Sequence, residues 1–110
     1  KRSTIKEKEV MKMFVISTPY VLDEKKILTE KVYDTDRYAC LNIQLKKGES
    51  VPSHFAISEV LVIVRSGVVE FTVEEETVEL SRNQLLHMDP KEVHSLVAKE
   101  DADLIVVQVH

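Results

Sequence analysis

The stretch between the chain's only two glycines, Gly48 and Gly67, sets the strongest limit on the fold. Gly48 follows two lysines, as in a turn, and Pro52 excludes a helix from the residues around it. Residues 60–64 then form the β-branched run VLVIV, which ends at Ser66 and Gly67. We therefore predict a turn, a loop, a strand and a second turn, with His54 where the loop meets the strand.

The rest of the chain repeats this pattern of short apolar segments between turn signals. Segments 27–33 and 38–45 flank a polar turn at 34–37 and predict a hairpin. Further strands are predicted over 13–16, 68–73, 78–80, 85–88, 95–98 and 104–109, and residues 3–12 as a short helix or an arm. Many short strands without a long helix indicate an all-β sandwich or barrel.

Alternation along one of these strands predicts which side chains face the core. In segment 38–45 the inward set is Ala39, Leu41, Ile43 and Leu45, and the outward set is Tyr38, Cys40, Asn42 and Gln44.

Composition narrows the class of protein. A length of 110 residues predicts one domain over 1–110, and 44% hydrophobic with 31% charged residues is typical of a globular chain. No apolar run approaches the roughly 20 residues that a membrane span needs, so we expect no membrane association. The net charge of −4, with lysines dispersed among acidic residues, argues against nucleic-acid binding. A charged N-terminus without a signal peptide and a single cysteine, Cys40, lead us to expect a cytoplasmic location.

The spacing of Gly48, His54 and Gly67 resembles the first motif of the cupin superfamily, G-x5-H-x-H-x3/4-E-x6-G. His94 falls on the histidine of the second motif. Ala56 and Val60 stand where the first motif has its second histidine and its glutamate, so the resemblance implies that Val60, with Val62 and Val64 in phase with it, faces the lumen. The resemblance covers about residues 27–109 and implies a small single-domain cupin. The implied fold is a double-stranded β-helix, or jelly-roll barrel, in which residues 1–26 form an N-terminal arm and a first short strand.

Cupins with the complete motif hold Fe, Mn, Ni or Zn with three histidines and a glutamate, so the resemblance implies a divalent transition metal as a cofactor. His54 and His94 carry over as metal ligands. We add His87 as a third ligand if its strand turns it inward, and Glu59 only if a β-bulge does the same. The alternatives are a buried or outward-facing His87, and a His54–His94 pair at a pocket rim that binds no metal.

Three functions remain open at this point. The first is a barrel that binds a small molecule, with or without a metal held by histidines, and the depleted ligand set favours it over catalysis. The second, from the resemblance, is a metal-dependent enzyme of oxygenase or isomerase type, and the third is a filled barrel that acts as an interaction module. We also expect a homodimer, because segments 60–64 and 104–109 are apolar on both faces.

Overall fold

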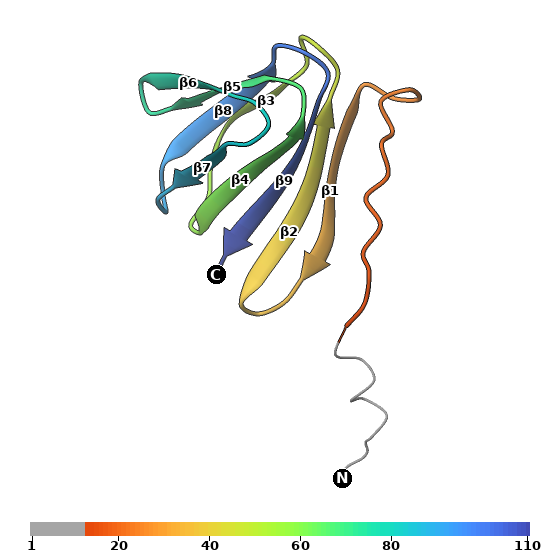
Figure 1. Cartoon of the computed structure of the whole chain (residues 1–110). Coiled ribbons are helices and arrows are strands. Elements are labelled where there is room, and N and C mark those ends of the chain that lie inside the picture. Colours follow the sequence, from red (N-terminus) through yellow and green to blue (C-terminus); the bar gives the residue numbers. More distant parts are fainter. Residues whose placement is uncertain (1–12) are drawn as a thin grey trace.

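The computed structural model describes residues 13–110, which form two antiparallel sheets that face each other (Figure 1). The larger sheet has the strand order β1-β2-β9-β4-β7, and the smaller one has the order β3-β8-β5-β6. The strands are β1 Ile27–Asp34, β2 Tyr38–Leu45, β3 Ser50–Phe55, β4 Glu59–Ser66, β5 Val69–Val73, β6 Glu76–Leu80, β7 Leu85–Met88, β8 Val93–Ala98 and β9 Ala102–Val109. The described residues contain no helix, so none forms an apolar helix long enough to cross a membrane. The predicted all-β jelly-roll architecture is confirmed.

The core fills the space between the two sheets, as alternation predicts. Val60, Val62 and Val64 are all buried on the inner face of β4. β2 contributes Ala39, Ile43 and Leu45, and Leu41 packs against the same cluster. From the opposite sheet, Phe71 of β5 is 1% exposed, so both inner faces contribute to one continuous core.

The outer face of β2 differs from the prediction, because Asn42 and Gln44 are also buried. The segment before β1 crosses this face and binds the Gln44 carboxamide at both ends. Gln44 Oε1 accepts the Val21 N–H at 2.9 Å, and Gln44 Nε2 donates to the Pro19 carbonyl at 2.9 Å. Leu22 of the same segment is 1% exposed. Gln44 therefore fixes the N-terminal segment to the sheet, and Asn42 accepts a second hydrogen bond from Gln44 Nε2 at 2.9 Å.

Two further local predictions were wrong. Residues 13–16 do not form a strand, and their side chains, Met13 to Ile16, are exposed. The predicted loop before residue 60 contains a strand, β3. The predicted helix or arm at 3–12 lies outside the described residues.

Candidate functional site

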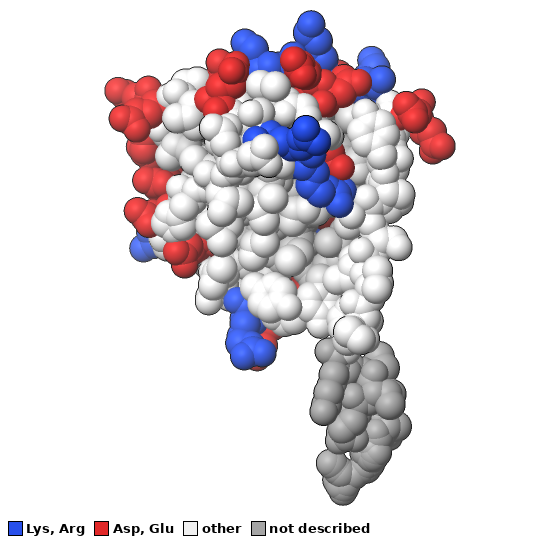
Figure 2. All heavy atoms as spheres, in the orientation of Figure 1, with Lys and Arg blue, Asp and Glu red and all other residues white. Residues whose placement is uncertain are grey.

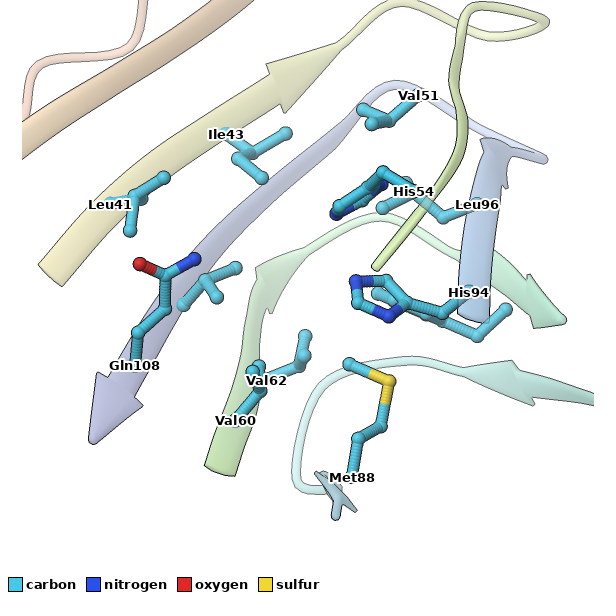
Figure 3. Close-up of a pocket in the computed structure, with 12 residues that line it drawn as sticks. Leu41, Ile43, Val51, His54, Val60, Val62, Met88, His94, Leu96 and Gln108 are labelled. Carbon is cyan, nitrogen blue, oxygen red and sulfur yellow. The ribbon is translucent and has the colours of Figure 1, made fainter. Parts of the chain in front are cut away.

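A cavity of about 140 Å³ lies between the two sheets. Apolar side chains form most of its wall: Leu41, Ile43, Val51, Val60, Val62, Phe71, Met88, Leu96 and Val106. The remaining lining residues are His54, His94 and Gln108 (Figure 3). His94 is 7% exposed, whereas His54 is exposed, which places His54 where the cavity meets solvent. The site is therefore an apolar chamber with a few polar groups, the usual composition of a small-molecule pocket.

A β-bulge in β3 turns His54 into this cavity. Val51 pairs with Leu96 of β8 and His54 pairs with His94, so β3 has one more residue between the two pairs than β8 has. In a regular strand, residues three positions apart face opposite sides, and the extra residue restores His54 to the side of Val51. Pro52 lies in the bulge, on an edge strand, where its missing N–H breaks no ladder hydrogen bond.

The two cavity histidines contact each other directly. They are opposite residues of β3 and β8, their ring centroids are 4.1 Å apart, and the rings meet edge to face at 69°. Figure 3 shows both rings at one side of the cavity, with Gln108 across from them. The sequence prediction that His54 and His94 share a site therefore agrees with their positions.

Backbone hydrogen bonds set the proton position on each ring. Nδ1 of His54 lies 3.1 Å from the Pro52 carbonyl oxygen, and Nδ1 of His94 lies 3.1 Å from the Glu92 carbonyl oxygen. A carbonyl only accepts, so Nδ1 carries the hydrogen and donates it in both rings. In a neutral ring, Nε2 then has an unprotonated lone pair and acts as an acceptor.

The electrostatic surroundings keep His94 neutral. Burial lowers the pKa of His94 below its usual value, and the neighbouring His54 lowers it further. The Glu92 carbonyl and carboxylate act in the opposite direction without reversing the shift. At neutral pH, His94 is therefore the uncharged Nδ1–H form.

The lowered pKa of His94 predicts that the folded protein is less stable at acidic pH. His94 takes up a proton near pH 6.5 in the unfolded chain and only at a lower pH in the folded protein. The unfolded state therefore binds more protons in that window, and the unfolding free energy should fall as the pH decreases from about 7 through the folded-state pKa. Urea unfolding of wild type and His94→Gln between about pH 8 and pH 5 measures the effect. The stability difference between the two proteins should change in favour of the variant as the pH falls. If the stability difference between wild type and His94→Gln does not change with pH, the pKa of His94 is not lowered by folding.

The predicted third ligand, His87, lies elsewhere. It pairs with Leu61 on the outer face of the larger sheet, because Leu86 and Met88 occupy the inward phase of β7. Glu59 is on the same outer face, and its Oε2 lies 2.7 Å from His87 Nε2. The register shift in β4 falls between Val64 and Ser66, so no bulge turns Glu59 inward. The prediction that His87 lies in the lumen was therefore wrong, and the condition on which Glu59 would have joined the site is not met.

The cavity residues do not fit the metal centre of the complete cupin motif. Among the residues that the structure describes, no group of three histidine, cysteine, aspartate or glutamate side chains is arranged to hold a metal ion. The two Nε2 atoms could each bind a metal ion, but an open catalytic site normally has three protein ligands. Weak binding of a transition metal by His54 and His94 stays a prediction, which the metal content of protein purified without chelator would test.

Gln108 is a lining residue that the sequence reading missed. Segment 104–109 was treated as apolar on both faces, yet alternation puts Gln108 in phase with Leu104 and Val106, both of which are buried. The signal was a single carboxamide on the inward phase of an otherwise apolar strand.

Comparisons with known proteins agree with this architecture. The family model described as "Cupin domain" matches residues 42–110. An RmlC-like cupin from Desulfovibrio desulfuricans superposes with a TM-score of 0.76 at 20% identity, covering 90% of this chain and 96% of that one. An RmlC-like cupin with a double-stranded β-helix fold from Methanocaldococcus jannaschii gives 0.74 at 23% identity, covering 90% and 92%. A conserved Streptococcus pyogenes protein of unknown function gives 0.73 at 20% identity, covering 89% and 96%. No curated protein matches the sequence.

Proposed function

This chain belongs to the cupin family, and on that premise we propose that it binds a small molecule in the cavity beside His54 and His94. The observation that carries the proposal is an apolar chamber in which two imidazoles from paired, neighbouring strands of the smaller sheet converge. Its volume of about 140 Å³ is close to that of an engineered apolar cavity, about 150 Å³, that accepts benzene. We therefore expect a ligand whose body is about the size of one aromatic ring.

The same observations favour this function over the two alternatives. A barrel filled by its own side chains would not have a chamber of this size. No carboxylate lines the chamber among the described residues, so a metal-dependent enzyme would lack the anionic ligand of the complete motif. Binding therefore has more support than turnover.

An NMR titration of the 15N-labelled full-length chain with a panel of ring-sized compounds tests the proposal. Binding should shift the backbone signals of residues that line the cavity on both sheets. Val51→Phe adds bulk inside the chamber and should abolish these shifts, whereas Val97→Phe, on the outer face of the same sheet, should preserve them. A panel without any cavity-centred shift, or equal binding by Val51→Phe, would overturn the proposal.

We also propose that two copies of this chain pair through the outer face of the larger sheet. Half-buried apolar side chains run across β2, β9 and β4, including Cys40, Val107 and Leu61, and Leu85 of β7 is 65% exposed. A shallow apolar hollow lies at one end of this face, between Tyr38, Cys40, Val107 and Val109, with Arg37 at its border. In Figure 2 the area over the lower part of these strands is largely white, and a group of basic side chains lies over their upper part. The middle of this face, around Cys40, Val107 and Leu61, is apolar, whereas the charged residues Glu59 and Arg65 lie toward the two ends of β4. A second copy presents the same apolar area and can cover it.

Sedimentation velocity at micromolar concentration should therefore find a dimer. Val107→Lys puts a charge in the middle of the face and should produce a monomer, because an unpaired buried charge is costly. Val93→Lys, at an exposed position on the smaller sheet, should remain dimeric. Wild type that sediments as a monomer would refute the pairing.

A further inference from the structure

We propose that the ligand of this cavity is a neutral hydrogen-bond donor, of the class of small phenols, whose hydroxyl donates to Nε2 of His54 or His94. This inference rests on the proposed binding function and specifies the chemistry of the bound group. It follows from the direction of the hydrogen bonds at the two imidazoles.

Both rings use Nδ1 as a donor to a nearby backbone carbonyl. The acceptors are the carbonyls of Pro52 and Glu92, each two residues before its histidine. Within residues 13–110, neither Nε2 has a hydrogen-bond partner, although both rings line the cavity. The polar side of the chamber in Figure 3 therefore presents two acceptors next to each other, and an acceptor needs a donor.

The absence of a basic side chain from the described lining disfavours an anionic ligand. No lysine or arginine is among the lining residues, so a carboxylate would meet the two lone pairs without a compensating cation. Burial of an uncompensated carboxylate is far more costly than burial of a hydroxyl group. A purely apolar ligand fits the wall but leaves both Nε2 atoms without a partner, which forfeits about 0.5–1.5 kcal/mol for each hydrogen bond not made.

Phenol, toluene and benzoate form a matched set for the test, since each has one ring and one small substituent. We would titrate each into the labelled full-length chain with EDTA present, at a pH where the histidines are neutral. Phenol should bind roughly 2- to 12-fold more tightly than toluene, the range that one hydrogen bond supplies. Benzoate should bind more weakly than both.

Variants identify the groups responsible. The double variant His54→Leu, His94→Leu should retain toluene binding, which shows that the chamber is intact, and should lose the preference for phenol. His87→Leu, on the outer face, should retain that preference.

The outcomes separate the two proposals. If benzoate binds most tightly, or if phenol binds no better than toluene, the inference is wrong and the binding function stands. If the double variant keeps the phenol preference, the histidines are not the acceptors and the inference is again wrong. If none of the three compounds shifts the cavity residues, both proposals fail.

Discussion

Gly67→Ala is expected to lower the unfolding free energy by at least about 3 kcal/mol, a large part of the roughly 5–15 kcal/mol by which a domain of this size is stable. Gly67 has a φ of +82°, a conformation that costs a non-glycine residue about 1–3 kcal/mol. An added Cβ would also overlap the Asp101 carbonyl and lie 2.7 Å from the Ala102 Cα. Both contacts are backbone atoms at the start of β9, so neither can rotate away.

Gly48→Ala is the matched control. Gly48 has a φ of +90°, but nothing lies within 4 Å of the position of an added Cβ. Only the backbone strain applies, and the expected cost is about 1–2 kcal/mol. Urea unfolding followed by circular dichroism measures both variants. Equal costs at the two glycines would show that the close approach of β9 to Gly67 is not what requires glycine there.

Asp103→Ala is expected to cost about 2–4 kcal/mol, the second large effect. The Asp103 carboxylate is buried and binds Arg65 Nη2 at 2.9 Å and Asn42 Nδ2 at 2.8 Å. Arg65 in turn donates to the hydroxyl and the carbonyl of Thr18. Loss of the carboxylate leaves a partly buried guanidinium without its anion, and it loosens the segment that crosses the outer face. Because Arg65 retains some exposure, we place the cost below that of a fully buried pair.

Lys99→Ala provides the comparison for that prediction. Lys99 and Glu70 form an exposed pair at 4.0 Å, and such pairs contribute between 0 and about 1 kcal/mol. Urea unfolding should show a clearly larger loss of unfolding free energy for Asp103→Ala than for Lys99→Ala. A cost for Asp103→Ala within the range found for Lys99→Ala would mean that the buried network does not stabilise the fold.

Alternation and turn signals predicted most of the strands because each is a local property of the sequence. The hairpin of β1 and β2 and the limits of β7 agree with the predicted segments. The cavity pair His54 and His94 came from motif spacing, which encodes contacts that no local pattern reveals. The strand β3 was missed because Pro52 normally interrupts a strand, and only the edge position and the bulge make it compatible with one.

The predictions for His87 and Gln44 failed for two other physical reasons. Alternation at β7 separates His87 from its neighbours, but it does not say which of the two phases faces the lumen. Packing decides this, with Leu86 and Met88 directed toward the core. The burial of Gln44 depends on Pro19 and Val21, more than twenty residues earlier in the chain, and a tertiary contact of that kind has no local signal.

The central claim is that His54 and His94 form a pair of hydrogen-bond acceptors for a ligand inside the barrel. Side-chain 15N NMR of the histidine-labelled protein, with signals assigned by His54→Leu and His94→Leu, tests it most directly. Above neutral pH, both rings should carry their proton on Nδ1, and the Nε2 signals of these two histidines should shift when phenol is added while those of His87 and His110 do not. Rings protonated on Nε2, or Nε2 signals that do not respond to a ligand bound in the cavity, would contradict the account.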